Sequence, residues 1–160
     1  FTIVIMSQDA PSLLSTPDSD GGWRIAIVAS RFNPDLIDGL MERTRSRLQE
    51  LGIRDNHIDC MRVPGSAELP YAAQRLADCG RYRVIIALGV LIRGETQHHD
   101  IISRTVSFGL QEVALSRRIP VINGVISAES WEQARDRTIG PIERGREFAE
   151  AAVEMANWNA

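Results

Sequence analysis

VIIALGVLI, at residues 84–92, is the strongest signal for a buried strand in this chain. The stretch is continuously apolar and is bounded by Arg83 and Arg93. Such a run is typical of a strand whose two faces are both covered by other elements. Arg93 leads directly into Gly94, which predicts a turn after the strand.

The rest of the chain repeats this unit, with a helical pattern after each strand-like run. The predicted strands cover residues 23–29, 57–63, 83–92 and 120–126, and the predicted helices cover residues 34–51, 68–77, 96–116, 127–137 and 141–158. Strands that alternate with helices indicate a parallel sheet built from right-handed crossovers. We therefore predict an α/β fold, a three-layer αβα sandwich around a four-stranded parallel sheet.

Residues 1–22 are predicted to form an arm before a single domain at residues 23–160. Residues 7–22 are rich in Ser, Asp, Pro and Gly, a composition that does not support a packed element. Residues 1–6 are apolar and β-prone, and such a piece needs a sheet edge with which to pair. Another subunit is one possible source of that edge.

The composition limits the possible functions. The chain has 160 residues, of which 44% are hydrophobic, enough for one domain with its own core. Its net charge of −3 gives no attraction to nucleic acid or to anionic membranes, and no apolar run is long enough to span a bilayer. All 18 basic residues are Arg, which excludes a lysine Schiff-base mechanism. Cys60 and Cys79 lack metal-binding or redox spacing, and we interpret them as reduced thiols of a cytoplasmic protein.

Ligands of a parallel sheet bind beyond the carboxyl ends of its strands, so the residues after each strand form the candidate site. After the first strand, Phe32 is available to stack on a flat ring, unless it packs under its own helix. Asn33 before Pro34 is typical of a helix N-cap. After the second strand, Gly65 allows close approach of a ligand. Glu68 can accept hydrogen bonds from a polyol, unless it only compensates the helix dipole.

The third strand is followed by RGETQH at residues 93–98. A strand that passes through a Gly turn into a helix N-terminus offers free N–H groups and a positive dipole end, which suit a phosphate. Thr96 adds a hydroxyl, and His98 is placed to exchange protons near neutral pH, unless it is purely structural. His99 and Asp100 follow, but consecutive helical residues point about 100° apart, so the three side chains do not converge on a metal.

After the fourth strand, Ser127 or Ser130 is expected to cap a helix that carries Arg135 and Arg137. These arginines bind an anion near the strand ends, or they belong to a solvated helix face. The sequence contains no P-loop, no dinucleotide-binding glycine fingerprint and no nucleophile elbow. The residues alone therefore predict an α/β domain with a phosphate pocket and one candidate acid–base histidine, His98.

Taken together, these segments resemble one family, 6,7-dimethyl-8-ribityllumazine synthase. The matching segments, in the family's order, are SRFN at 30–33, VPGSAELP at 63–70, IALGVLIRGETQH at 86–98, PVINGV at 120–125 and QARDR at 133–137. The resemblance covers residues 23 to about 155. The RGxTxH element with VPGxxExP upstream is its most specific part.

The resemblance implies a flavodoxin-like fold and a cofactor-free transferase, with residues 23–160 as its catalytic domain. Such enzymes condense 5-amino-6-(D-ribitylamino)uracil with 3,4-dihydroxy-2-butanone 4-phosphate to 6,7-dimethyl-8-ribityllumazine, phosphate and water, the penultimate step of riboflavin biosynthesis. Imine formation, phosphate loss and ring closure each need proton transfers, which one positioned histidine can serve. Holding the two substrates together supplies further acceleration.

The resemblance also assigns roles to single residues. His98 is the expected proton donor and acceptor, and Phe32 is expected to stack on the pyrimidine ring. Glu95 and Thr96, through backbone N–H and hydroxyl groups, and Arg137 are expected to hold the butanone phosphate. The other expected contacts are Ser66, Ala67 and Glu68 for the ribityl chain and uracil, Val90, Leu91 and Ile92 for the uracil through backbone groups, and Asn123 for the pocket wall of a neighbouring subunit.

Three features depart from the family's pattern. Ala67 stands where many relatives have an aromatic residue, which makes that wall of the pocket looser, and Asn123 stands where many have Phe. Residues 138–146 replace a Gly-, Lys- or His-rich linker. Arg144 or Arg146 is the candidate for the missing positive charge, unless the segment is only a solvated turn.

Family members form pentamers whose active sites lie between subunits and whose N-terminal strand is added to the sheet of a neighbouring subunit. Residues 1–6 fit that use. A homopentamer, or a multiple of pentamers, is therefore the expected assembly, and the 138–146 linker favours a free pentamer over a hollow shell. Riboflavin synthase is a candidate partner, and neither nucleic acid nor membrane is expected. Two other functions stay open: a non-catalytic flavin or lumazine carrier on the same fold, and a phosphatase or phosphosugar enzyme, which would need a nucleophile or a metal cluster.

Overall fold

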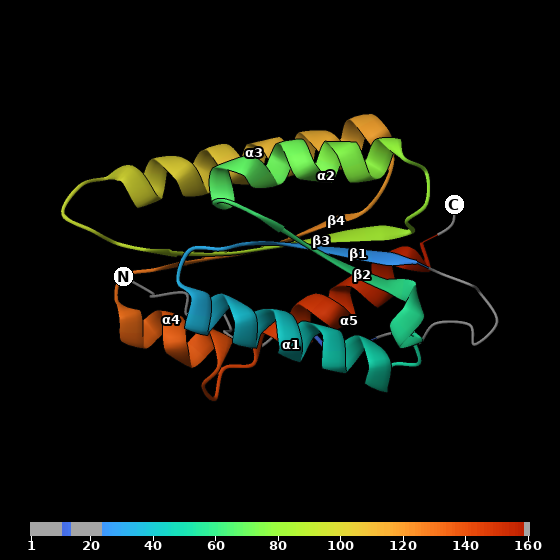
Figure 1. Cartoon of the computed structure of the whole chain (residues 1–160), viewed down its shortest axis with the longest axis horizontal. Coiled ribbons are helices and arrows are strands. Elements are labelled where there is room, and N and C mark those ends of the chain that lie inside the picture. Colours follow the sequence, from blue (N-terminus) through green and yellow to red (C-terminus); the bar gives the residue numbers. More distant parts are fainter. Residues whose placement is uncertain (1–10, 14–23, 159–160) are drawn as a thin grey trace, which may run out of the picture.

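The structure, a computed structural model, describes residues 11–13 and 24–158, so the predicted strand at residues 1–6 and most of the predicted arm fall outside the described residues. The strands are β1 (Ile25–Ser30), β2 (Ile58–Val63), β3 (Val84–Ile92) and β4 (Val121–Ala128). The α-helices are α1 (Pro34–Glu50), α2 (Leu69–Asp78), α3 (His98–Arg117), α4 (Trp131–Thr138) and α5 (Arg144–Ala156), with short 3₁₀ helices η1 (Asp55–His57) and η2 (Ser66–Glu68). Strands and helices alternate along the chain as predicted (Figure 1).

The four strands form one parallel sheet in the order β2-β1-β3-β4, which confirms the predicted sheet. The stretch VIIALGVLI forms β3, one of the two inner strands. Leu88 of β3 pairs with Ala29 of β1 on one side and with Gly124 of β4 on the other. Because all strands run in the same direction, their carboxyl ends lie at one edge of the sheet.

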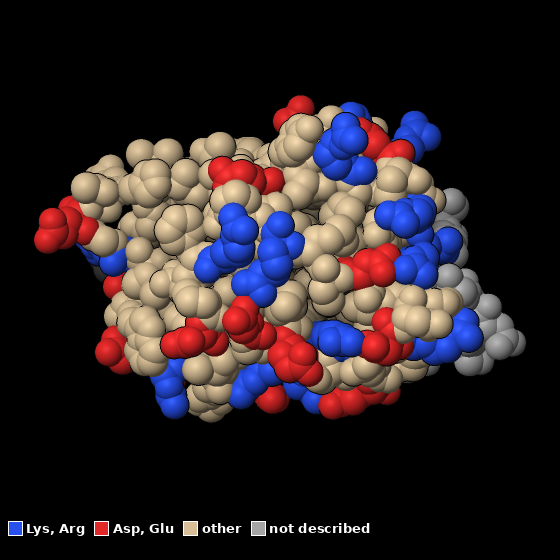
Figure 2. Space-filling model, viewed as in Figure 1, with Lys and Arg blue, Asp and Glu red and all other residues tan. Residues whose placement is uncertain are grey.

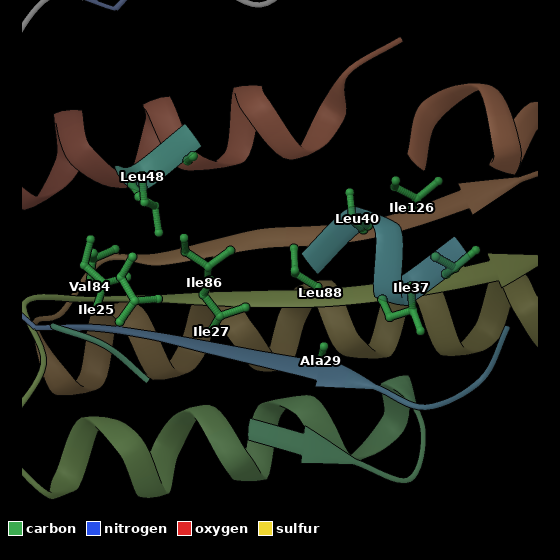
Figure 3. Packing of buried hydrophobic residues seen from close by; sticks show 14 of the residues in the cluster. Ile25, Ile27, Ala29, Ile37, Leu40, Leu48, Val84, Ile86, Leu88 and Ile126 are labelled. Carbon is green, nitrogen blue, oxygen red and sulfur yellow. The ribbon is translucent and has the colours of Figure 1, made fainter. Parts of the chain in front are cut away.

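Helices α2 and α3 cover one face of the sheet, and α1, α4 and α5 cover the other (Figure 1). Successive side chains of a strand point to opposite faces. In β1, Ile25 and Ile27 pack in the cluster with α1 and α5, whereas Ala26 and Val28 pack with α2 and α3. Figure 3 shows the first cluster, in which Leu40 of α1 lies over the strands. The three-layer sandwich is therefore confirmed, and its two covered faces explain why β3 is apolar throughout.

Ion pairs join α1 to α5, two of the helices that cover the same face of the sheet. Arg47 of α1 contacts Glu50 at 2.8 Å and Glu150 of α5 at 2.7 Å. Arg146 contacts Glu50 at 3.3 Å. Figure 2 shows acidic and basic side chains interspersed on one face of the molecule.

The boundary between β4 and α4 differs from the prediction. Ser127 pairs with β3, so the strand continues to Ala128 and the helix predicted from residue 127 begins only at Trp131. Ser130 is the cap, because its hydroxyl oxygen accepts the Gln133 N–H at 3.2 Å. Pairing with a neighbouring strand thus displaces the helix start that the local sequence predicted.

The segment between α4 and α5 is a turn that hydrogen bonds from α1 hold in place. The prediction that the last helix begins in this segment, at residue 141, is wrong. Arg43 donates to the carbonyl oxygens of Ile139 at 2.5 Å and Gly140 at 2.7 Å. A Cβ atom at Gly140 would lie 2.6 Å from the Cα of Asp136, so this close approach requires glycine. These contacts keep the segment out of a helical path, and α5 begins only at Arg144.

Candidate active site

A pocket of about 410 Å³ opens at the carboxyl ends of β1, β2 and β3. Its walls come from the segments after these strands and from the first turns of α3, where a parallel sheet binds its ligands. The pocket is lined by Phe32, Asn33, Gly65, Ser66, Ala67, Glu68, Val90, Leu91, Ile92, Gly94, Thr96, His98, His99 and Ile102. Most of the site residues predicted from the sequence therefore lie together.

The loop after β1 presents an aromatic ring to the pocket. Phe32 is 68% exposed, so the alternative in which it packs under its own helix is wrong. The ring lies beside Gly65, where a Cβ atom would be 3.2 Å from the phenyl Cε2. An exposed ring beside a bare backbone surface is suited to stacking on a planar ligand.

Asn33 has a different role from the predicted side-chain N-cap. Its backbone lies in the left-handed region, with φ 56°, and its carbonyl oxygen accepts the N–H groups of Leu36 and Ile37 at 3.0 Å each. Its side-chain Nδ2 instead donates to the carbonyl oxygen of Val90 at 3.1 Å. The amide therefore ties the end of β1 to the end of β3, where Val90 belongs to the predicted uracil contact.

The loop after β2 supplies the carboxylate of the pocket. The Gly65 N–H donates to Glu68 Oε2 at 2.7 Å, and the Glu68 N–H donates back to the Gly65 carbonyl at 3.2 Å. Glu68 Oε1 makes no hydrogen bond within residues 24–158, so it can still accept one from a ligand. Ser66 is buried beside Gly89 of β3, where a Cβ atom would lie 2.4 Å from the serine Oγ.

The first turn of α3 opens towards the pocket. The helix begins at His98, two residues later than predicted, after an irregular segment at residues 93–97. The Thr96 hydroxyl oxygen accepts the His98 N–H at 3.4 Å. The His98 side chain is exposed and lines the pocket, which disfavours a purely structural role. A helix N-terminus beside an exposed imidazole can bind an anion and exchange a proton.

A second cavity, which we call the polar hollow, adjoins the pocket at this loop and has a volume of about 630 Å³. It is lined by Arg93, Gly94, Glu95, Thr96, Gln97, His99, Asp100, Arg104 and Glu129. The predicted site residue Glu95 lies here. Arg93 forms an ion pair with Glu129 at 2.8 Å, and Arg104 forms one with Asp100 at 3.1 Å. The hydrogen bond and the charge of Glu129 raise the pKa of Arg93.

Asn123 and Arg137 do not line the pocket of their own chain. Asn123 is exposed in the middle of β4, and its Nδ2 donates to Ser107 Oγ of α3 at 3.0 Å. Arg137 is half-buried on α4, and its Nη1 donates to the Gln133 carbonyl at 3.1 Å. Their substrate contacts stay predictions, which require a neighbouring subunit.

Arg144 and Arg146, the candidates for a cationic linker group, also lie away from the pocket. Arg144 contacts Glu147 at 2.5 Å, and Arg146 contacts Glu50 at 3.3 Å. Within one chain, therefore, both guanidinium groups are paired with carboxylates of α5 or α1.

From the sequence we assign no site role to three residues that line the pocket, which are Asn33, His99 and Ile102. Ile102 follows His98 by four residues, a helical spacing that places both on one face and could have identified it. His99 entered the sequence argument only as a metal ligand. Within residues 11–13 and 24–158, no group of three or more His, Cys, Asp or Glu side chains is arranged to hold a metal ion. None of the described helices combines the length and apolar character needed to cross a membrane.

Comparison with known proteins identifies one family. Residues 22–160 match the family model of 6,7-dimethyl-8-ribityllumazine synthase. The lumazine synthase of Paraburkholderia phymatum is 43% identical over 142 residues, which cover 88% of this chain and 81% of the relative. That of Azoarcus sp. is 40% identical over 136 residues, 85% of each chain. That of Coxiella burnetii is 40% identical over 138 residues, 86% of this chain and 91% of the relative.

Proposed function

The chain belongs to the 6,7-dimethyl-8-ribityllumazine synthase family, and from this premise we propose what its residues do in the reaction. The protein is a transferase that condenses 5-amino-6-(D-ribitylamino)uracil with 3,4-dihydroxy-2-butanone 4-phosphate in the penultimate step of riboflavin biosynthesis. The observation that carries the assignment of roles is the pocket, where Phe32, Glu68 and His98 lie together beside the N-terminus of α3. No observation favours a non-catalytic flavin or lumazine carrier.

The uracil substrate occupies the pocket between the loops after β1, β2 and β3. Phe32, which is 68% exposed, stacks on the pyrimidine ring. Glu68 accepts hydrogen bonds from the ribityl hydroxyls through Oε1, because Oε2 already holds the Gly65 N–H at 2.7 Å. The neighbouring contacts are Ser66 and Ala67 for the ribityl chain and uracil, and the backbone groups of Val90, Leu91 and Ile92 for the uracil.

The butanone phosphate binds at the first turn of α3. The support is the segment after Gly94, where Glu95 and Thr96 line the cavities, their N–H groups make no hydrogen bond within the described residues, and Thr96 adds its hydroxyl. Arg137 adds a guanidinium group, and Asn123 adds part of the wall. Because neither residue lines the pocket of its own chain, both act on the site of a neighbouring subunit.

His98 moves the protons of the reaction. The 5-amino group attacks the ketone and water leaves, which forms an imine. A proton then leaves the carbon next to the imine as the C–O bond to phosphate breaks, which leaves an enol. The enol takes up a proton at its terminal carbon and becomes a ketone, and the ribityl-bearing nitrogen adds to this carbonyl and closes the ring with loss of water. Each step needs a proton donor or acceptor at the reacting atoms, and His98 is the exposed imidazole of the pocket. Holding both substrates in one pocket accounts for further acceleration.

A homopentamer completes the active site in this proposal. Helix α3 carries an apolar stripe that is unusually exposed in the single chain: Ile101 is 59%, Phe108 78% and Leu115 71% exposed. These residues recur every seven positions, so they lie on one side of the helix. Large exposed apolar surfaces of this kind mark protein–protein contacts. The stripe therefore supports packing of α3 against neighbouring subunits. Size exclusion with light scattering separates a free pentamer from a larger shell.

Two further parts of the proposal concern the location of the protein in the cell and its protein partner. A cytoplasmic location is supported by Cys60 and Cys79, which are both free thiols. Riboflavin synthase is the proposed partner, since it consumes the lumazine. Cell fractionation tests the location, and co-purification of the two proteins from cells tests the partnership.

The assignment of function is tested with the purified protein and both substrates. We expect lumazine fluorescence to rise much faster than in the spontaneous condensation, and only when both substrates are present. A carrier protein would instead bind lumazine and leave the rate of its formation at the background value.

A further inference from the structure

His99 stands at the boundary between the pocket and the polar hollow. The two cavities share three lining residues, Gly94, Thr96 and His99, and only His99 brings an imidazole to both. His98 lines the pocket but not the polar hollow. Consecutive helical residues point about 100° apart. Both imidazoles therefore line the pocket, but only that of His99 also lines the polar hollow.

The two nitrogens of the His99 ring have different surroundings. Nδ1 is buried and has no hydrogen-bond partner in the described part of the chain. Nε2 is accessible, and it too makes no hydrogen bond to the described residues. A buried N–H without an acceptor is rarer in folded proteins than a buried acceptor without a donor. We therefore assign an N–H to Nε2, from which it can be donated to a ligand in the cavities.

The arginines of the polar hollow are already paired. Arg93 contacts Glu129 at 2.8 Å, and Arg104 contacts Asp100 at 3.1 Å. With Glu95, three carboxylates face two guanidinium groups, so the charge of this hollow does not favour a phosphate. A phosphate that binds there depends on other donors, such as backbone N–H groups and the Nε2–H of His99.

We propose that His99 donates a hydrogen bond from Nε2 to the butanone phosphate and so strengthens the binding of this substrate, while His98 carries out proton transfer. This inference rests on the proposed function, since it concerns the second substrate of the same reaction. No covalent bond forms or breaks at His99. Its contribution is to bind and orient the phosphorylated substrate at the boundary of the two cavities.

The test compares two substitutions in the intact oligomer. His99→Phe keeps a ring of similar size and removes both nitrogens, whereas His99→Gln restores an N–H donor near the position of Nε2. We expect His99→Phe to raise KM for the butanone phosphate about tenfold, the effect of losing one hydrogen bond to a charged group. KM for the uracil substrate should change less than twofold, and His99→Gln should recover most of the affinity. His57→Phe, in η1 and outside both cavities, is the matched control and should leave both KM values unchanged.

Inorganic phosphate gives a second readout that does not depend on turnover of the variants. Its inhibition constant against the butanone phosphate should rise in His99→Phe by a similar factor. If His99→Phe leaves both KM values at the native level, the ring only packs and the inference is wrong. Equal increases in both KM values would also refute it, because they indicate a general distortion. If the native enzyme is active and His99→Phe has native KM values, only this inference is rejected. If the native protein is inactive, the proposed function is rejected and the inference with it.

Discussion

The dual use of Glu68 yields the sharpest prediction about this site. Its Oε2 accepts the Gly65 N–H at 2.7 Å and holds the turn, while Oε1 is available to the ribityl chain. Glu68→Ala removes both functions. Glu68→Gln keeps a carbonyl oxygen for the Gly65 N–H but loses the negative charge. The two substitutions therefore separate the structural role from the binding role.

The structure suggests a magnitude for each role. A capping hydrogen bond contributes about 1 kcal/mol at an exposed position such as Glu68. Glu68→Ala should therefore lower Tm by about 2–4 °C, the shift per kcal/mol for a domain of this size. Hydrogen bonds to a charged group contribute about 1.5–3 kcal/mol, which corresponds to an increase in KM of roughly ten- to a hundredfold. We expect Glu68→Gln to raise KM for the uracil substrate within this range and to leave Tm nearly unchanged.

Thermal unfolding and steady-state kinetics with each substrate varied in turn measure both effects. Glu42→Gln is the matched control, because this carboxylate lies on α1 and accepts only the Ser46 hydroxyl at 3.2 Å within the described chain. If Glu68→Gln leaves KM for the uracil substrate unchanged, or raises both KM values alike, Glu68 does not bind the ribityl chain.

Three further predictions concern the phosphate, the core and the thiols. Arg137→Ala should raise KM for the butanone phosphate about tenfold and KM for the uracil substrate less than twofold in steady-state assays, and equal effects would contradict a phosphate contact. Leu88→Ala, fully buried in β3, should lower the free energy of unfolding by about 2–5 kcal/mol in a urea titration, and a loss below about 0.5 kcal/mol would be inconsistent with its burial. Burial of the Cys79 thiol opposes its ionisation, but hydrogen bonds and the charge of Arg81 outweigh this effect and lower its pKa. Burial raises the pKa of the Cys60 thiol. Cys79 should therefore hold more thiolate near pH 8 and react faster with iodoacetamide, as mass spectrometry can show, and faster labelling of Cys60 would reverse this order.

The fold was predictable because hydrophobic pattern alone defines its layers. The continuous apolar run of β3 indicated a strand covered on both faces, and β3 is an inner strand of the sheet. Element ends were less predictable where long-range contacts decide them. Pairing with β3 extends β4 to Ala128, and Arg43 of α1 holds the carbonyl groups of Ile139 and Gly140 before α5. The local sequence contains no signal for either contact.

The site was predictable where each wall follows directly from a strand end. The Gly turn before α3 and the exposed Phe32 were both visible as local patterns. The hydrogen bond from Asn33 to Val90 was not, because the two residues are 57 positions apart. The position of His99 between two cavities was also hidden, since it depends on the path of the irregular segment before α3. Asn123 belongs to a different class, because its predicted role requires a second subunit.

Turnover of the His98→Ala variant tests the central claim most directly, namely that this pocket makes lumazine with His98 as its proton-transfer group. With both substrates saturating, we expect kcat to fall about 10²–10⁴-fold, while the circular dichroism spectrum and both KM values stay close to native. His98 is exposed at the start of α3, so its removal should not disturb the fold. A variant that forms lumazine at the native rate would contradict the claim and would place the proton transfers at another group.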